Sequence, residues 1–482
     1  MLDVRPVLFI SGFVLLVLAA AMGVPVAVDV ATSHSEWPSF LVSAMASAFF
    51  GLVLIAANRT AGATDLSIRQ AFLLTAVGWG LASVFGALPF YFGTLRLSPV
   101  DALFETVSGI TTTGSTILTG LDGLPRAILM WRALLQWLGG VGVIVTSVAL
   151  LPILGIGGMQ LFRMETSDKT DKVKSRLAVV AFSVLLVYGL FTLVLAVALS
   201  GVGMTPLEAV CHAMAAISTG GFSTSDQSLG HFGDGARWIC VLGMLAGGAS
   251  FTRYGAVWTR NRRALLDDSQ IRWYLAVIVA FAVALTVWNW LGRDLEPYEA
   301  FRQSVFNVVS VITTTGFHTD NYGAWRGFGQ VAFFFMMFIG GCTGSAAGGI
   351  KIFRYGVLFA VTRVQIRKLL HPHGVFVIDF NQIPLTDAVI RSVLGFMMFY
   401  FFCAVLLALG LTLFGLDVVS ALSGAASALA NVGPGLGSVI GPGGNFADLP
   451  DAAKCLLLFG MMVGRLELAT LLILFSKLFW RE

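Results

Sequence analysis

Four short segments, which we call the glycine loops, combine glycine with threonine or asparagine inside an otherwise apolar sequence of 482 residues. They span residues 110–115, 217–222, 312–317 and 429–434. Because glycine reaches backbone angles that other residues avoid, consecutive carbonyl oxygens of such a loop can point at one ion and replace its water shell. Threonine hydroxyls can add oxygen ligands. This pattern indicates a binding site for a dehydrated cation.

Each glycine loop contributes three candidate ligand residues. They are Thr112, Thr113 and Gly114; Thr219, Gly220 and Gly221; Thr314, Thr315 and Gly316; and Asn431, Val432 and Gly433. The loops recur about every hundred residues, so an internal repeat organises the chain. Four copies in the same context argue against the alternative that threonine and glycine only allow close helix packing. The fourth loop has no threonine, and we therefore expect imperfect fourfold symmetry.

The elements that position these loops are predicted to cross a membrane. Hydrophobic residues make up 57% of the chain and charged residues 12%, which is more apolar surface than a soluble core could bury. Runs of about 20 apolar residues can span the bilayer. Ten are predicted, near 7–29, 38–57, 70–94, 127–151, 177–201, 236–258, 272–292, 328–360, 388–414 and 452–478.

A shorter apolar segment precedes each glycine loop, at residues 101–112, 206–218, 298–313 and 417–430. Because about 12 residues cannot cross a bilayer, each segment should be a helix that enters the membrane and turns back. Acidic residues near the starts of these segments suit the positive end of a helix dipole. They are Asp101, Glu208, Glu299 and Asp417.

The predicted fold class is an all-α polytopic membrane protein with two N-terminal transmembrane helices. Four repeats follow, each a membrane helix, a pore helix and a second membrane helix, arranged around a pseudo-fourfold pore. The predicted divisions are 1–60 for the N-terminal helices, then 61–165, 166–262, 263–375 and 376–482 for the four pore repeats. Most of the 30 basic residues fall on one side of this topology. The bias predicts that both termini are cytoplasmic and that all four glycine loops enter from outside.

The second helix of the third repeat contains a glycine-rich break at residues 340–349, followed by Lys351. Its five glycines are Gly340, Gly341, Gly344, Gly348 and Gly349. Each costs a helix about 1 kcal/mol relative to alanine, so the helix should be interrupted on the inner side of the glycine loops. The break is either a movable gate or a packing notch between helices.

Arg465 lies inside the last predicted span, where an unpaired charge is costly. It must therefore face water in a pore or a partner in another repeat. Glu467 is two residues away and points to a different helix face, so it is not the expected partner.

The glycine loops resemble the four filter loops of the Trk/Ktr/HKT potassium transporter superfamily. The closest resemblance is to the membrane subunit of bacterial Trk potassium uptake systems. It rests on residues 108–114, 218–222, 312–317 and 431–434, on 131–140 and 464–467, and on the two extra N-terminal helices. It covers essentially the whole chain.

The resemblance implies potassium uptake across the bacterial inner membrane through a channel-like pore. It places K⁺ at Thr113, Gly114, Gly220, Gly221, Thr315, Gly316, Val432 and Gly433. It also implies a gate formed by the glycine-rich break, Lys351 and Arg465, a homodimer, and a cytoplasmic nucleotide-binding regulatory ring of the TrkA type. The basic inner loops could dock this ring or only reflect topology and contact with lipid. Beyond bound K⁺, no cofactor or nucleic-acid partner is expected.

Three alternatives remain open. Family members that admit Na⁺ often carry serine at the position of Gly114, so glycine there favours K⁺ without excluding a Na⁺-permeable or Na⁺/K⁺ transporter. An intramembrane enzyme would need a paired base and nucleophile, and neither His212 nor His318 is directly adjacent to an acidic residue in the sequence. A rocking transporter would be expected to have inverted repeats, whereas these four repeats share one orientation.

Overall fold

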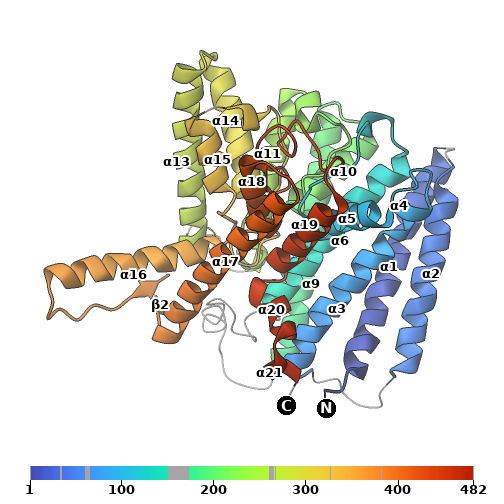
Figure 1. Cartoon of the computed structure of the whole chain (residues 1–482), viewed down its shortest axis with the longest axis horizontal. Helices are drawn as coiled ribbons and strands as arrows, with labels where there is room; N and C mark the ends of the chain where they lie inside the picture. The colour runs from blue at the N-terminus through green and yellow to red at the C-terminus, as the bar shows by residue number, and fades with distance from the viewer. Residues whose placement is uncertain are drawn as a thin grey trace.

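The computed structural model describes the chain except residues 1, 33–34, 60–65, 150–172, 260–264, 266, 326, 382 and 481–482. The regular secondary structure of the described part is helical apart from one small hairpin. In this hairpin β1 (Asp379–Phe380) pairs antiparallel with β2 (Ile383–Pro384). Two helices from the N-terminal part lie at one edge of the body, a helix about three quarters of the way along the chain projects sideways at the opposite edge, and the two termini lie near each other (Figure 1). The predicted boundaries at 60/61, 165/166 and 262/263 lie outside the described residues.

The two N-terminal helices are α1 (Arg5–Ala31) and α2 (Trp37–Ala57), which pack against each other along the edge of the body (Figure 1). They approach closely where Gly12 faces Gly51, because a Cβ atom on Gly12 would lie 2.7 Å from the Gly51 carbonyl oxygen. Small residues allow this kind of contact between membrane helices. Helix α1 continues the packing inward onto α3 and α6.

The rest of the chain repeats one pattern of helices. The first unit contains α3 (Ile68–Gly86), α4 (Leu88–Phe92), α5 (Pro99–Ile110), η1 (Leu121–Gly123) and α6 (Arg126–Ala149). The second contains α9 (Val173–Gly201), α10 (Pro206–Ile217), η3 (Ser228–His231), α11 (Asp234–Gly248) and α12 (Phe251–Thr259). The third contains α13 (Ser269–Gly292), α14 (Pro297–Ile312), η4 (Tyr322–Ala324), α15 (Phe328–Met336) and α16 (Ile352–Leu370). The fourth contains α17 (Asp387–Leu413), α18 (Val418–Ala430), α19 (Asp451–Arg465), α20 (Leu468–Leu472), η5 (Ile473–Phe475) and α21 (Lys477–Trp480).

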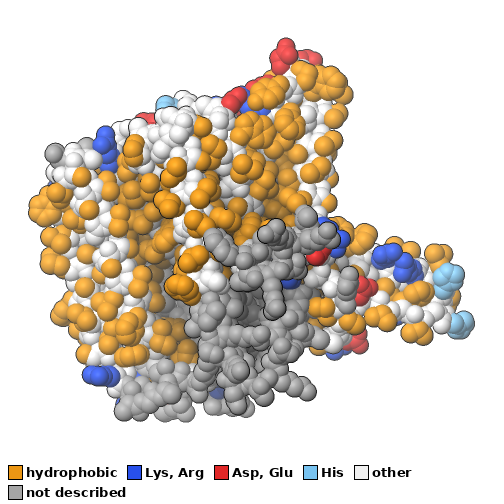
Figure 2. Space-filling model, turned by 180° about the vertical axis from the view of Figure 1, so that it is seen from behind, with side chains coloured by type: hydrophobic (Ala, Val, Ile, Leu, Met, Phe, Trp, Pro, Cys, Tyr) orange, Lys and Arg blue, Asp and Glu red, His pale blue; other side chains and the backbone are white. Residues whose placement is uncertain are grey.

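Among the described residues, seven helical stretches are long and apolar enough to cross a membrane. They include both N-terminal helices, the first helix of every unit and α6. The three other predicted spans are the second membrane helices of units two, three and four, and each is divided. On the face seen in Figure 2, apolar side chains cover most of the described body, and the charged side chains lie mainly toward its ends. This distribution is typical of a multi-span membrane protein.

Two of these divisions contradict the predicted continuous helices at 236–258 and 452–478. Helix α11 ends at Gly248 because Ala249 is extended, with φ −89° and ψ 163°, and α12 starts only at Phe251. Helix α19 ends at Arg465, and Glu467 then takes a left-handed conformation with φ 57°. The predicted interruption at 340–349 is confirmed, since α15 ends before it and α16 begins after it.

The short helices α5, α10, α14 and α18 begin where the acidic residues predicted. Ser98 caps α5 and Thr205 forms a capping box with Glu208 in α10. Asp417 itself caps α18 and accepts hydrogen bonds from the backbone N–H groups of Val419 and Ser420. Hydrogen bonds from Ser420 and these backbone groups hold the pKa of Asp417 below its usual value. These acids therefore stabilise helix starts.

The four units close on themselves around the short helices. Helix α10 packs on α6 of the preceding unit, α14 packs on α11, and α5 of the first unit packs on α19 of the fourth. An ion pair of 2.7 Å between Lys454 and Asp101 ties the fourth unit to the first. The order of packing is therefore cyclic, although the chain is linear.

Candidate cation-binding site

The four glycine loops share one backbone conformation. The first candidate ligand residue of each loop is left-handed, with φ values of 52° at Thr112, 51° at Thr219, 56° at Thr314 and 56° at Asn431. The glycine two residues later is also left-handed, from 80° at Gly221 to 105° at Gly433. Asparagine tolerates this region better than most residues do, so Asn431 preserves the loop without a threonine.

The loops contact one another in a closed ring. A Cβ atom on Gly114 would overlap the carbonyl oxygen of Gly220, one on Gly221 that of Thr315, and one on Gly316 that of Val432. The ring closes because a Cβ atom on Gly433 would lie 2.7 Å from the carbonyl oxygen of Thr113. Each loop thus places its glycine against the backbone of the next, and no side chain fits at any of the four positions. The predicted ligand residues are brought together.

Hydrogen bonds within the ring hold two of the candidate hydroxyls. Thr113 Oγ1 lies 2.7 Å from Thr111 Oγ1 and accepts a 2.9 Å bond from Asn431 Nδ2. Thr315 Oγ1 lies 2.8 Å from Thr313 Oγ1. Because these hydroxyls already have partners, the backbone carbonyls are the better candidates for ion ligands at these positions. The buried Thr112 hydroxyl, in contrast, has no hydrogen-bond partner among the described residues.

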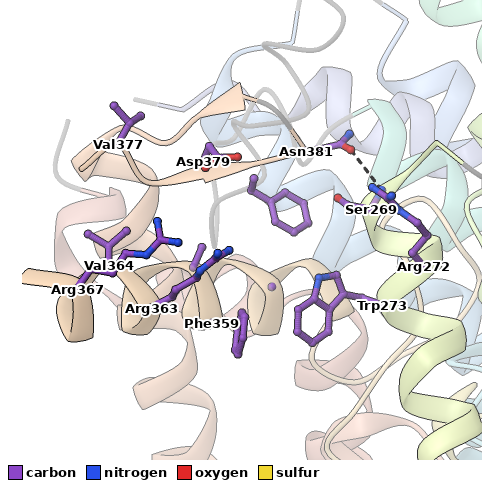
Figure 3. Close-up of a pocket in the computed structure, with 13 residues that line it drawn as sticks. Ser269, Arg272, Trp273, Phe359, Arg363, Val364, Arg367, Val377, Asp379 and Asn381 are labelled. Carbon is purple, nitrogen blue, oxygen red and sulfur yellow. Dashed lines mark hydrogen bonds between the residues drawn. The ribbon is translucent and has the colours of Figure 1, made fainter. Parts of the chain in front are cut away.

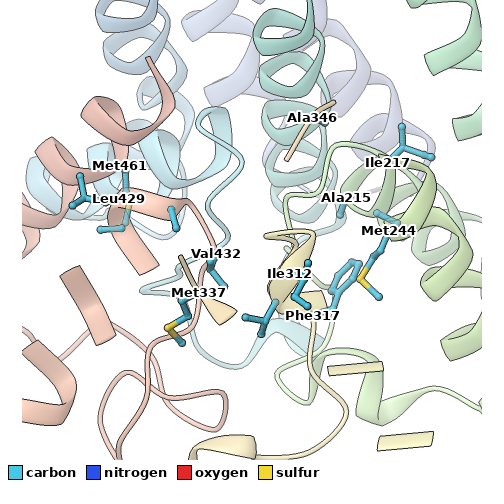
Figure 4. Close-up of a cluster of buried hydrophobic side chains, with 14 of the residues drawn as sticks. Ala215, Ile217, Met244, Ile312, Phe317, Met337, Ala346, Leu429, Val432 and Met461 are labelled. Carbon is cyan, nitrogen blue, oxygen red and sulfur yellow. The ribbon is translucent and has the colours of Figure 1, made fainter. Parts of the chain in front are cut away.

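Apolar side chains surround the ring and exclude water from its outer wall. Ile217, Ile312 and Leu429 come from the ends of the short helices and cluster with Met244, Met337 and Met461 (Figure 4). Phe317 is the last residue of the third loop and is fully buried. Carbonyl groups fixed in such a low-dielectric surrounding interact strongly with a cation.

The ends of three short helices pack closely against glycines of the second membrane helices. The sequence analysis did not predict this contact. A Cβ atom on Gly139 would overlap the carbonyl oxygen of Ile110, and one on Gly464 that of Leu429. On Gly247 it would lie 2.6 Å from the carbonyl oxygen of Ile217. The sequence does contain a signal for this contact, because a glycine recurs at a similar distance after three of the glycine loops.

The glycine-rich break lies directly against the third and fourth glycine loops. The Gly348 N–H donates to Thr314 Oγ1 over 2.6 Å, and a Cβ atom on Gly348 would overlap the carbonyl oxygen of Ala430. The break is also joined to the division between α11 and α12. Cys342 N donates to the Gly248 carbonyl over 2.9 Å, and Phe251 N donates to the Gly344 carbonyl over 3.0 Å.

Two buried cations border a small cavity beside this break. Arg465 donates from Nη2 to the Ala346 carbonyl over 2.6 Å, while its Nε and Nη1 atoms have no partner in the described chain. Lys351 Nζ donates to the Ala347 carbonyl, and both side chains line the cavity together with Gly348 and Gly464. Glu467 pairs with Arg354 over 2.7 Å, so the expectation that it does not pair with Arg465 is confirmed.

A family model described as TrkH, cation transport protein, matches residues 38–481. The chain belongs to this family. It is 45% identical over 484 residues to the Trk system potassium uptake protein TrkI of Halomonas elongata, covering 99% of this chain and 97% of the relative. It is 36% identical to TrkH of Escherichia coli, covering 99% of both chains. The crystal structure of the potassium transporter TrkH from Vibrio parahaemolyticus superimposes with a TM-score of 0.92 at 34% identity over 100% of both chains.

These similarities confirm the resemblance derived from the glycine loops. The protein is an all-helical, multi-span membrane protein of the TrkH family, which is a family of transporters and not of enzymes. His212 fits this assignment because it has structural partners: its ring nitrogens lie 2.8 Å from the Glu208 carbonyl and 2.9 Å from Ser223 Oγ. Among the described residues, no cluster of histidine, cysteine and carboxylate side chains could hold a metal.

A buried ion pair holds the segments that follow the first two glycine loops of this TrkH-family protein, and the sequence did not reveal it. Arg132 Nε on α6 donates to Glu105 on α5 over 2.7 Å, with side chains 1% and 0% exposed. Glu105 also accepts hydrogen bonds from Thr116 Oγ1 and from the Ile117 N–H. Arg132 Nη1 donates to the Ser223 carbonyl, and its guanidinium lies 4.1 Å from the centre of the Phe222 ring. One pair therefore holds the segments after both the first and second glycine loops.

Gln136, one turn further along α6, holds the second glycine loop itself. Its Nε2 atom donates to the Gly220 carbonyl over 2.5 Å, and its Oε1 atom accepts from the Phe222 N–H over 3.1 Å. The amide occupies the space that a side chain at Gly220 would need. This contact explains why glycine replaces the threonine found at the same position of loops one and three.

Replacing Thr314 with valine should loosen the glycine-rich break. The substitution keeps the shape of the side chain but removes the acceptor of the Gly348 N–H, and an unsatisfied buried group costs about 1–3 kcal/mol. We expect higher basal cation flux in proteoliposomes containing Thr314→Val, whereas Thr314→Ser should behave like the native protein. Equal flux through all three proteins would show that this hydrogen bond does not restrain the break.

Proposed function

We propose that this protein carries out potassium uptake across the bacterial inner membrane through a channel-like pore that the four glycine loops line. The closed ring of glycines and carbonyl oxygens is the observation that carries the proposal. K⁺ would bind at Thr113, Gly114, Gly220, Gly221, Thr315, Gly316, Val432 and Gly433. The names of the relatives, which are potassium uptake proteins, support the same substrate.

Glycine at all four ring positions supports K⁺ as the transported ion over Na⁺. A dehydrated K⁺ ion is larger than Na⁺ and loses its water shell more easily, so carbonyl oxygens at fixed separation compensate its dehydration better. A Na⁺-permeable or Na⁺/K⁺ transporter with the same fold is the second candidate. The unpartnered Thr112 hydroxyl favours this candidate, because it offers one further oxygen at the first loop.

The glycine-rich break and Arg465 are proposed to close the pathway on the inner side of the ring. The break contacts Thr314, and Arg465 binds the break through Ala346. The two free nitrogens of Arg465 and the nearby Lys351 place positive charge beside the cavity. A cation leaving the ring inward would be repelled until the break and these side chains moved together.

Replacing Arg465 with alanine should increase cation flux. A unit charge within about 8 Å of the ion path costs a passing cation about 2 kcal/mol at an effective dielectric constant of about 20, equivalent to roughly thirtyfold in rate. Arg465→Lys keeps the charge and is the matched control. Flux is measured in proteoliposomes containing equal amounts of each purified protein. A fall in flux for the well-folded alanine variant would contradict the barrier role.

The proposed assembly is a homodimer with a cytoplasmic nucleotide-binding ring of the TrkA type. The same proposal includes the division of the chain into two N-terminal helices and four pore repeats. It also includes the cytoplasmic position of both termini. The exposed Arg363, Arg367 and Lys368 on the projecting helix α16 are available for contact with other molecules.

Growth at limiting K⁺ tests the function. Expression in a bacterial strain without its own potassium uptake systems should restore growth and uptake of K⁺ or its tracer Rb⁺. A parallel assay of Na⁺ uptake separates the two candidate functions. Absence of rescue by a membrane-inserted protein that is present with its regulatory partner would refute potassium uptake, and equal uptake of Na⁺ would support the second candidate.

A further inference from the structure

A basic cavity lies at the predicted inner end of helix α13. It has a volume of about 400 Å³ and is enclosed by the first turn of α13, by α16 and by the β1–β2 hairpin (Figure 3). Arg272 comes from α13, and Arg363 and Arg367 come from α16. The Ser269 N–H donates to Asn381 Oδ1 and joins the start of α13 to the hairpin.

The charge of this cavity is not neutralised within the described part of the chain. No described carboxylate forms an ion pair with Arg272, Arg363 or Arg367, and Asp379 on the hairpin is the acidic residue of the lining. Three arginines and one aspartate leave an excess of two positive charges. Arginine presents a fork of N–H donors that matches the oxygens of a phosphate group.

An aromatic pair lines this basic cavity together with the arginines. Trp273 and Phe359 meet edge to face with ring centres 5.2 Å apart, and both line the cavity (Figure 3). Phe359 is 55% exposed. Tryptophan is enriched at the boundary between the hydrocarbon core and the lipid headgroups, so the pair marks this boundary at the cavity.

An exposed apolar stripe begins one turn above the arginine and runs the length of α13. Its residues recur at every fourth position and are Leu275, Val279, Val283, Val287 and Leu291. Residues three and seven positions apart lie on one face of a helix, so Arg272 shares the face of Leu275 and Val279. The charged cavity and the stripe are therefore continuous.

We propose that this cavity binds the phosphate headgroup of an anionic phospholipid, with its acyl chains lying along the apolar stripe of α13. Basic pockets beside membrane helices on the cytoplasmic side recognise such headgroups. A soluble phosphate ion would use the same arginines, and an acidic segment of a cytoplasmic partner could also approach them. Neither would use the stripe, which is why the lipid is the occupant that fits all of these features. The binding does not depend on which cation the protein transports.

Native mass spectrometry of the purified full-length protein tests this site, with phosphatidylglycerol as the anionic probe and zwitterionic phosphatidylcholine, which has no net charge, as the comparison. The double variant Arg363→Gln/Arg367→Gln should bind phosphatidylglycerol about thirtyfold more weakly, because each basic residue at the membrane surface contributes about a factor of five. Arg272→Gln should weaken binding several-fold. The matched control is Lys368→Gln/Arg391→Gln, which removes two exposed inner charges outside the cavity and should leave binding unchanged. Unfolding in detergent checks that all variants are equally stable.

The remaining measurements separate the possible occupants. Phosphatidylglycerol should stay bound when inorganic phosphate is added at millimolar concentration; complete displacement would assign the site to free phosphate and overturn the proposal. The proposal also fails if the cavity variant and the control lose lipid equally, or if neither does. Normal lipid binding by the cavity variant together with lost co-purification of a cytoplasmic regulatory subunit would assign the arginines to that partner instead.

Discussion

Replacing Gly316 with alanine should strongly reduce selective potassium uptake while leaving the protein in the membrane. The Cβ atom of alanine would overlap the carbonyl oxygen of Val432 and lie 2.9 Å from Pro434 Cδ, so the third and fourth glycine loops would have to separate. A hydrogen bond to a charged group contributes about 1.5–3 kcal/mol, and a lost carbonyl contact to the ion should cost as much. The expected decrease in K⁺ uptake is therefore roughly tenfold to hundredfold, measured with Na⁺ uptake in the same vesicles.

Gly415 provides the matched control for this substitution. It is left-handed like Gly316, with φ values of 89° and 83°, but a Cβ atom on Gly415 would meet nothing within 4 Å. Gly415→Ala therefore carries the same backbone strain without a collision. If Gly415→Ala impairs uptake as strongly as Gly316→Ala does, backbone strain and not ring geometry explains the loss. Normal uptake by Gly316→Ala would exclude the ring as the ion pathway.

The local features of the fold could be predicted because each depends on neighbouring residues. Short apolar segments that start with a capping residue, such as Thr205 or Asp417, form short helices in any context that buries them. Glycine clusters interrupt helices, so the break at 340–349 was also predictable. Even the backbone of the fourth loop follows a local rule, since Asn431 takes the left-handed conformation that threonine takes in the other loops.

Contacts between units could not be predicted, because the sequence of one unit does not specify which residues of the next unit it will contact. The pairing of Gly114 with Gly220 and the closure of the ring between Gly433 and Thr113 depend on the packing of all four units. The positions at which α11 and α19 end could not be predicted for the same reason. Gly248 ends α11 where the glycine-rich break supplies the Cys342 N–H to its carbonyl, and the sequence of α11 alone does not contain that donor.

The distribution of buried charge around the ring suggests different roles for its two sides. On the side of the segments that follow loops one and two, Glu105 neutralises Arg132, and the pair joins two units without adding net charge. Near the glycine-rich break, Glu467 pairs with Arg354, and no carboxylate of the described residues forms an ion pair with Arg465 or Lys351. A neutral pair is suited to holding loops in place, whereas uncompensated positive charge is suited to opposing a cation.

Replacing Arg132 with methionine should destabilise the segments that follow the first two glycine loops. Glu105 would remain buried without its cation, and breaking a buried ion pair in this way costs about 3–5 kcal/mol. Because Arg132 also holds the Ser223 carbonyl, the second glycine loop should lose its position, and both thermal stability and K⁺ uptake should fall steeply. Arg293→Met is the matched control, since its pair with Asp320 is 3.5 Å long with side chains 32% and 30% exposed and should contribute no more than about 1 kcal/mol.

The double variant Glu105→Gln/Arg132→Met distinguishes a charge effect from lost packing. It removes both charges, so the penalty for an unpaired buried group disappears and stability should recover well above that of Arg132→Met. Uptake should recover less, because the double variant still lacks the donor to Ser223 that positions the second loop. If the double variant is as unstable as the sum of the single variants, the charges do not interact energetically. Arg132 would then contribute to the ring through its contacts with Ser223 and Phe222 alone.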